Sequence, residues 1–203
     1  IGKGSVTLDD FYNAEVIIIL GQNPGTNHPR MLTALQKAKE NGCTIISVNP
    51  LPETGLIAFN DPQSIKGALG IKARLTNIFL QVKINGDMAL LQAIEKLLLI
   101  EEEKNPGSVF DHEFINEKTN GSKEFIQHLK NLDLNTLIAA SGISKEQILE
   151  VANIFKTKNK IIACWAMGLT QHQNAVDPIK EVVNLLLLKG SIGKPRAGTC
   201  PVR

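Results

Sequence analysis

The polar residues best suited to bind a ligand come directly after a short apolar run, 16–20. The loop that follows, Gly21–His28, contains four side chains that can bind phosphate oxygens or the edge of a purine: Asn23, Thr26, Asn27 and His28. It matches neither the GxGxxG pattern of dinucleotide-binding proteins nor the GxxxxGKS/T pattern of P-loops, because no lysine follows a second glycine. Ordinary NAD binding and NTP hydrolysis are therefore disfavoured. The alternative is a turn in which Thr26 or Asn27 caps the next helix, and one loop can serve both purposes.

A second polar position, Asn49, follows the apolar run 43–48. A nicotinamide dinucleotide site usually has Asp or Glu at the end of this strand, where the carboxylate binds the ribose 2′-OH. An amide both donates and accepts hydrogen bonds, so Asn49 favours a different nucleotide or a different contact with ribose. The alternative is an Asx turn before Pro50 with a structural role only.

A third group, Met167, Gly168, Gln171 and His172, follows the apolar run 160–165. Gly168 permits a close approach between the backbone and a ligand. His172 is a conceivable general base, but no carboxylate lies at a sequence spacing that would orient it. The alternative for His172 is a loop imidazole that makes one hydrogen bond.

The spacing of histidine and cysteine argues against metal chemistry within this chain. Neither HxxxH nor CxxC occurs, so the sequence predicts no metal bound by protein ligands and no local iron–sulfur motif. The three cysteines, Cys43, Cys164 and Cys200, are far apart in the sequence and are expected to be small buried apolar residues.

Hydrophobic periodicity predicts the elements that would hold these loops. Strands are expected at 15–20, 43–48, 77–84 and 160–165, and helices at 29–42, 87–103 and 174–189. Residues 50–76 are expected to hold a short helix and a loop, and 190–203 a tail rich in Gly and Pro. A helical insertion, about 104–160, has candidate helices at 111–118, 122–129 and 144–157. Parallel strands with right-handed crossovers would bring the loops together at one carboxyl edge, where α/β sheets bind ligands.

Composition limits the classes of partner. The chain has 203 residues, a net charge of +2 and 4% aromatic residues, which argues against nucleic-acid or membrane partners. No apolar run approaches the roughly 18–20 residues needed to span a bilayer, and no signal peptide is visible, so a cytoplasmic location is expected. The chain starts without Met and ends on Pro-Val-Arg, which suggests an excised fragment.

Six motifs occur in an order that resembles the molybdopterin oxidoreductases, especially formate-dehydrogenase-H-like alpha subunits. They are GQNPGTNHP from Gly21, Asn49-Pro50, LQV from Leu80, GDMALL from Gly86, WAMGLTQ from Trp165, and GSIGKP from Gly190 through to Pro201-Val-Arg203. The resemblance covers nearly the whole chain. It implies an α/β fold, a single three-layer αβα Rossmann-like domain over 1–203 with a mostly parallel sheet and the helical insertion.

The resemblance also implies a cofactor, bis-molybdopterin guanine dinucleotide with molybdenum, of which this domain would hold one arm. The implied contacts are phosphates at Gly21, Asn23, Thr26, Asn27 and His28, ribose or guanine at Asn49, the nucleotide pocket at Gly86 and Asp87, and the pterin dinucleotide at Met167, Gly168 and Gln171. From the sequence alone, Asp87 is a plausible N-cap or first-turn anion of its helix.

Arg203 matches the active-site arginine of the family, which faces molybdenum and orients an anionic substrate such as formate. A guanidinium offers a planar fork to such an anion. The molybdenum ligand and the remaining domains of the parent chain lie outside this sequence, so the isolated chain is expected to be inactive. Whether the parent holds an iron–sulfur cluster is left open, and the alternative is a stand-alone nucleotide-binding or regulatory module without redox activity.

Overall fold

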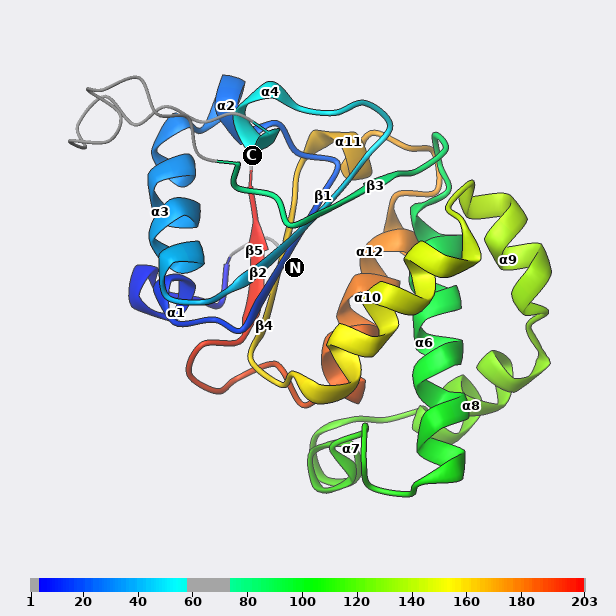
Figure 1. Ribbon diagram of the computed structural model, residues 1–203. Helices are drawn as coiled ribbons and strands as arrows, with labels where there is room; N and C mark the ends of the chain where they lie inside the picture. The colour runs from blue at the N-terminus through cyan, green and yellow to red at the C-terminus, as the bar shows by residue number, and fades with distance from the viewer. Residues whose placement is uncertain (1–3, 58–73, 203) are drawn as a thin grey trace.

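A five-stranded sheet forms the centre of the computed structural model, and every neighbouring pair of strands in it is parallel. The structure describes residues 4–57 and 74–202. The strand order is β3-β2-β1-β4-β5 (Figure 1). The strands are β1 Val16–Leu20, β2 Thr44–Asn49, β3 Ile78–Gln81, β4 Ile161–Trp165 and β5 Gly198–Pro201. The four strands predicted from apolar runs are therefore confirmed, with β3 shorter than expected.

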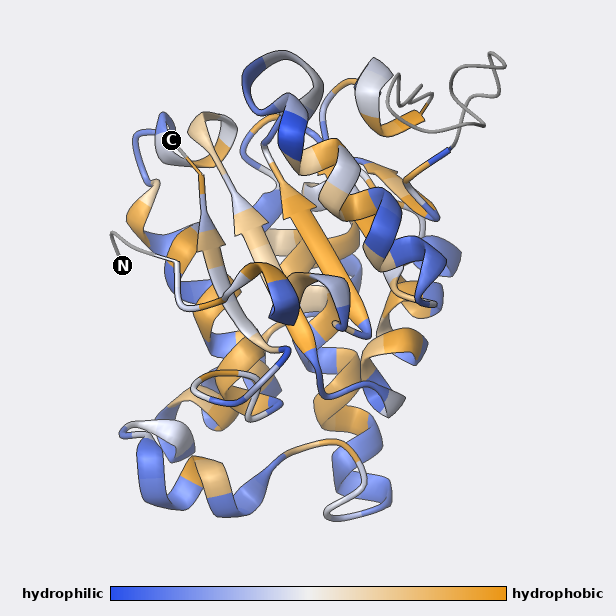
Figure 2. Ribbon diagram, turned by 90° about the vertical axis from the view of Figure 1, so that its left-hand side faces the viewer, coloured by the Kyte–Doolittle hydropathy of each residue, from blue (hydrophilic) through white to orange (hydrophobic). Residues whose placement is uncertain are grey.

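The strands β1 and β4 are buried along their whole length, as expected for a parallel sheet that is covered on both faces. Ile18 of β1 lies in register with Ile46 of β2 on one side and with Ala163 of β4 on the other. The strands form a hydrophobic band through the molecule (Figure 2). A continuous run of β-branched residues suits this position because both faces of each strand are excluded from water.

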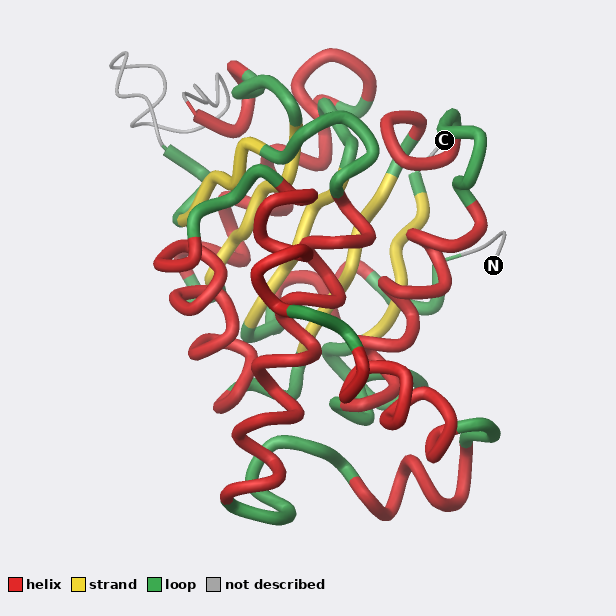
Figure 3. The backbone as a smooth tube through the Cα atoms, turned by 90° about the vertical axis from the view of Figure 1, so that its right-hand side faces the viewer, coloured by secondary structure: helices red, strands yellow, loops and turns green. Residues whose placement is uncertain are grey.

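Helices cover both faces of the sheet, which confirms the predicted three-layer αβα fold. Successive residues of β1 alternate between two cores: Ile18 contributes to one and Ile17 to the other. One face is covered by α1 Leu8–Tyr12 and α3 Pro29–Glu40. The other is covered by α6 Asp87–Lys104, α10 Lys145–Thr157 and α12 Val176–Leu188, the side that faces the viewer in Figure 3.

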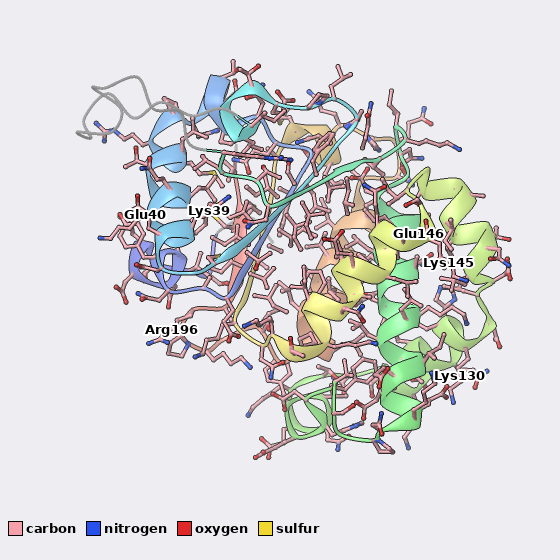
Figure 4. The ribbon with its side chains drawn as sticks, viewed as in Figure 1. Lys39, Glu40, Lys130, Lys145, Glu146 and Arg196 are labelled. Carbon is pink, nitrogen blue, oxygen red and sulfur yellow. The ribbon has the colours of Figure 1, made fainter. Side chains whose placement is uncertain are left out.

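The helices predicted between 104 and 160 are present as α7 His112–Lys118, α8 Ser122–Asn131 and α10. With a further helix, α9 Leu134–Ser141, they extend the α6 layer, and both α8 and α9 pack against α6. The N-termini of α7, α9 and α10 are capped by the side chains of Asp111, Asp133 and Ser144. The charged residues Lys130, Lys145 and Glu146 are exposed on the outside of this part (Figure 4).

Several short elements differ from the sequence-based expectation. The helices α1 and α9 were not predicted, and the loops expected after β1 and β4 contain one-turn helices, α2 Pro24–Asn27 and α11 Met167–Thr170. The predicted short helix after β2 is α4 Thr54–Ile57. Elements this short carry too few residues for periodicity to show.

The Gly/Pro-rich tail, 190–203, in which no strand was predicted, contributes β5. Its backbone pairs with β4, and Thr199 also accepts a hydrogen bond of 2.8 Å from the N–H of Ser5. Gly and Pro are unfavourable within strands, so the local sequence gave no sign of this one. Pairing with residues distant in sequence decides its structure. Within 4–57 and 74–202, the chain forms no helix with the length and apolar character needed to cross a membrane.

Two buried carboxyl groups face each other between α6 and α12. Glu95 is fully buried, and Glu181 has 4% of its surface exposed. Neither oxygen of Glu95 has a hydrogen-bond partner, and the same holds for Oε1 of Glu181. Burial, reinforced by the neighbouring Glu181, raises the pKa of Glu95 well above its usual value. The folded protein therefore holds a proton on Glu95 that the unfolded chain releases at a lower pH.

Because of this pair, we expect the free energy of unfolding to fall as pH rises above about 4.5. In that range the folded state binds more protons than the unfolded state. Replacing Glu95 with Gln should make stability less dependent on pH and raise it at pH 8 by about 1–2 kcal/mol, since the amide can donate to Glu181 without ionising. Urea denaturation between pH 5 and pH 9 measures this. Glu150→Gln, at an exposed position on α10, is the control. A Glu95→Gln protein with the wild-type pH profile would contradict the prediction.

Candidate functional site

The predicted binding residues lie in loops and helix starts that gather at the carboxyl edge of the sheet. The one-turn helices α2, α4 and α11 follow β1, β2 and β4 at this edge (Figure 1). In open α/β sheets, ligands bind at this edge, and preferentially where the strand order reverses. Here the order reverses at β1, since β2 lies on one side of it and β4 on the other.

Two glycine contacts hold these loops together. The N–H of Gly168 donates to the carbonyl of Gly21 at 3.0 Å, and a Cβ atom on Gly168 would lie 2.6 Å from that oxygen. Gly21 itself has φ +57°, and its Cβ would lie 2.7 Å from the carbonyl carbon of Gly168. The helices α2 and α4 meet in the same way, at Gly25 and Gly55. A side chain at position 168 would therefore overlap the backbone of the other loop. This is a structural reason for glycine at this position, in addition to the predicted close approach of a ligand.

The prediction that Thr26 or Asn27 caps the next helix is wrong, because the N-cap of α3 is His28, which makes no side-chain cap hydrogen bond. Asn23 instead caps the one-turn helix α2: its Oδ1 accepts a hydrogen bond from the N–H of Thr26 at 3.2 Å, and its Nδ2 donates to Glu53. Thr26 and Asn27 are exposed. Asn23 is thus engaged within the protein, whereas the side chains of Thr26 and Asn27 can contact a ligand.

Two polar atoms in this region are buried without a hydrogen-bond partner, Oε1 of Gln22 and Nδ1 of His28. Gln22 is 2% exposed, although sequence reasoning assigned it no role. The backbone carbonyl of Gln22 accepts a hydrogen bond of 3.1 Å from the side-chain Nδ2 of Asn49, a residue that is itself 3% exposed. Leaving a buried polar atom unpaired costs about 1–3 kcal/mol, so such atoms are rare in proteins without a reason.

The start of α6 places a buried acid beside the loop that follows α11. Asp87 is the first residue of α6, with Gly86 as N-cap, so it is a first-turn anion and not the cap itself. It is 5% exposed. Burial raises its pKa to about 6, while its own backbone N–H and the charge of His172 oppose this effect. The fold thus brings together Asp87 and His172, although no carboxylate lies at a sequence spacing that would orient His172.

His172 also contacts the backbone turn that precedes α6. Its Nδ1 lies 3.0 Å from Oδ1 of Asn85, a residue with φ +64°. Asn tolerates this left-handed conformation better than most side chains. Since Nδ1 bonds an amide oxygen, it carries the proton in the neutral ring, and Nε2 is then an acceptor.

The remaining predicted residues lie near or beyond the end of β4. Met167 has 51% of its surface exposed, and Gln171 is an exposed residue at the end of α11. Met167 lines a groove of about 680 Å³ together with Trp165, Val176, Pro201, Val202 and neighbouring residues of α12. Arg203 lies outside the described residues.

Three longer helices that begin at the carboxyl edge leave their first N–H groups without side-chain caps. This holds for α3, which starts at Pro29, and for α6 and α12, in contrast to the capped α7, α9 and α10 of the insertion. Free N–H groups at a helix start attract anions. Among the residues of 4–57 and 74–202, no cluster of His, Cys, Asp and Glu has the composition to hold a metal ion.

Comparison with known proteins identifies relatives of this chain. The family model for molybdopterin oxidoreductases matches residues 3–202. A protein named as an uncharacterized oxidoreductase from Mycobacterium tuberculosis is 50% identical over 203 residues, all of this chain and 26% of the relative. Protein YdeP of Escherichia coli is 39% identical over 208 residues, which cover 27% of its length. Formate dehydrogenase H of Escherichia coli is 25% identical over 205 residues, or 26% of its length.

A solved structure shares the fold. Acetylene hydratase from Pelobacter acetylenicus aligns with a TM-score of 0.72 and 19% sequence identity, over 90% of this chain and 22% of that protein. The chain spans about a quarter of the length of the curated relatives named above.

Proposed function

The chain belongs to the molybdopterin oxidoreductase family, and from this we propose that its carboxyl edge binds one guanine dinucleotide arm of a molybdenum–pterin cofactor. One observation carries the proposal. Polar atoms that need partners are buried at this edge, next to helix starts without side-chain caps. A ligand rich in N–H donors and phosphate oxygens would satisfy both.

The chemistry of the donors and acceptors fits such a dinucleotide. Guanine presents N–H donors on one edge, and the carboxylate of Asp87 and Oε1 of Gln22 are acceptors. A pyrophosphate accepts hydrogen bonds, and the side chains of Thr26 and Asn27 and the first turn of α3 offer donors. His28 contributes a ring at the start of α3. Asn23, Asn49 and the glycines Gly21, Gly86 and Gly168 shape the pocket, while Met167 and Gln171 contact the pterin side.

When bound, the cofactor supplies two-electron redox chemistry, and this chain's residues bind and orient it. We further propose a formate-dehydrogenase-like reaction on a small anion in the full-length protein, with Arg203 holding the anion. Support for this part is the sequence resemblance and the relationship with formate dehydrogenase H. The other segments of the full-length protein would supply the second half of the site.

Asp87 offers the sharpest test. Asp87→Asn should lower the affinity for the guanine dinucleotide roughly 10- to 100-fold, because a charged acceptor of a buried hydrogen bond is lost. The measurement is the guanine nucleotide released by acid hydrolysis from the purified full-length protein, per protein chain, beside its molybdenum content. For the wild type, nucleotide retention should also fall as pH drops below about 6, where Asp87 becomes protonated in the unliganded site.

Asp177→Asn is the matched control, since Asp177 lies in the first turn of α12 with its side chain 58% exposed. It should retain as much nucleotide as the wild type. Equal retention by Asp87→Asn and wild type would exclude Asp87 from the site. A wild-type protein with pterin but no guanine nucleotide would exclude the dinucleotide form.

A further inference from the structure

Two cysteines that are distant in sequence are neighbours in the sheet. Cys164 of β4 and Cys200 of β5 are register partners on adjacent parallel strands. Both lie on the face of the sheet covered by α1 and α3, and both are free thiols. The pair therefore forms a local dithiol at the edge strand of the sheet.

The two thiols differ in their access to solvent. Cys164 is fully buried, whereas Cys200 is half-buried and lines an open groove of about 640 Å³. The groove lies between the N-terminal segment, the start of α3 and β5, and its walls are mainly apolar, with Phe11, Met31 and Ala34 among them. A small molecule that enters this groove reaches the sulfur of Cys200 and not that of Cys164.

The more accessible thiol, Cys200, is also the more acidic of the two. The neighbouring thiol of Cys164 lowers the pKa of Cys200, although partial burial of Cys200 opposes this, while burial raises the pKa of Cys164 well above its usual value. Burial also raises the pKa of the third cysteine, Cys43, to about 12. The thiolate is the nucleophilic form of cysteine, so Cys200 is the thiol prepared to react first.

We propose that Cys200 is a thiol–disulfide exchange site for small, uncharged, apolar disulfides, and that Cys164 completes the exchange by forming a Cys164–Cys200 disulfide. Adjacent strands lie about 4.8 Å apart, within the range of about 4.4–6.8 Å between Cα atoms that a disulfide spans. This inference concerns the groove beside α1 and α3 and does not depend on the proposed function.

The chemistry balances in two steps. The Cys200 thiolate attacks one sulfur of the small disulfide RSSR, so the S–S bond of RSSR breaks and Cys200–S–S–R forms. The released RS⁻ takes up the proton that Cys200 gave to solvent when it ionised. Cys164 then attacks the sulfur of Cys200, its proton passes to the departing second RS⁻, and the protein disulfide forms. Two protein thiols are oxidised, and one RSSR is reduced to two RSH.

The groove also sets the preference among disulfides. Among its described lining residues, Arg30 carries a full charge and His28 is the other ionisable nitrogen group. A cationic disulfide would meet Arg30 and lose the apolar contacts. Dithiodipyridine reacts faster than the dication cystamine with any thiol because its leaving group is better, so each rate is divided by the rate of the same reagent with free cysteine. The normalised rate with dithiodipyridine should be roughly fivefold or more higher than that with cystamine, since like charges a few ångströms apart cost about 1 kcal/mol in water.

The test treats the reduced full-length protein with dithiodipyridine, follows thiopyridone release by absorbance, and maps the products by peptide mass spectrometry. The wild type should yield a cross-link between the peptides of Cys164 and Cys200. Cys164→Ala should stop at the mixed disulfide on Cys200, with one thiopyridone fewer. Cys200→Ala should lose both products, and Cys43→Ala, the matched control, should react as the wild type does.

Each other outcome counts against the proposal. An unmodified Cys200 in the wild type would refute the exchange site, and a mixed disulfide that persists in the wild type would refute the role of Cys164. Modification of Cys43 as fast as Cys200 would remove the selectivity. Peptide mapping of the wild type decides these points even where a variant does not fold.

Discussion

Replacing Gly21 with alanine should lower the free energy of unfolding by about 2–5 kcal/mol and reduce cofactor retention with it. The left-handed backbone of Gly21, with φ +57°, costs a non-glycine residue about 1–2 kcal/mol. The new Cβ would also lie 2.7 Å from the backbone of Gly168 and Leu169, and relieving such overlap typically costs about 1–3 kcal/mol. The two loops would have to separate, and they hold most of the proposed binding residues.

Gly193→Ala separates the two contributions. Gly193 has a similar conformation, φ +73°, but a Cβ there would meet no atom within 4 Å. This control should lose about 1–2 kcal/mol and keep its cofactor. Urea denaturation followed by circular dichroism gives the stabilities, and guanine nucleotide content gives the retention. Equal losses in the two variants would mean that the contact between the two loops contributes nothing.

Glu102→Ala should have the largest effect on stability, a loss of about 3–5 kcal/mol. The side chain of Glu102 accepts hydrogen bonds from three backbone N–H groups, those of Gly107, Val109 and Phe110, and lies 2.6 Å from the ring of His112. Alanine would leave these donors without a partner in the turn between α6 and α7, where Val109 and Phe110 are buried and Gly107 is exposed. Each unpaired buried donor costs about 1–3 kcal/mol, with some relief from entering water.

The neighbouring Glu103→Ala provides the control. Glu103 forms an ion pair of 2.7 Å with Lys130, but its side chain is 48% exposed and that of Lys130 is 45% exposed. Lys130 lies on the outer surface of α8 (Figure 4). Exposed ion pairs of this kind contribute about 0–1 kcal/mol. Urea denaturation of both variants compares them, and similar losses would contradict the proposed importance of the Glu102 network.

The Glu102 network also predicts a pH dependence. Burial would raise the pKa of Glu102, but the backbone N–H groups and His112 outweigh it and lower the pKa to about 2. The stabilisation by Glu102 is therefore fully present above its unfolded pKa, about 4.5, and is lost as pH falls toward 2. In Glu102→Ala, the free energy of unfolding should therefore fall less between pH 6 and pH 3 than it does in the wild type. Urea denaturation at these two pH values measures the difference.

The sequence alone determined the class of fold and predicted that the candidate binding residues gather at one edge of the sheet. Runs such as 16–20 and 161–165 are apolar throughout, and only a parallel sheet covered on both faces buries every residue of such strands. The ordered motifs then indicated the molybdopterin oxidoreductase family, which the match over residues 3–202 confirms. These are properties of local pattern and of order along the chain, so no coordinates were needed.

The tertiary structure alone decided the contacts between residues that are distant in sequence. It paired Gly21 with Gly168, brought His172 to Asp87, and added the strand that places Cys200 beside Cys164. It also showed that Gln22 is buried with an unpaired oxygen. None of these leaves a local signal, because hydrophobic periodicity reports which face of an element is buried and not which distant residue lies against it.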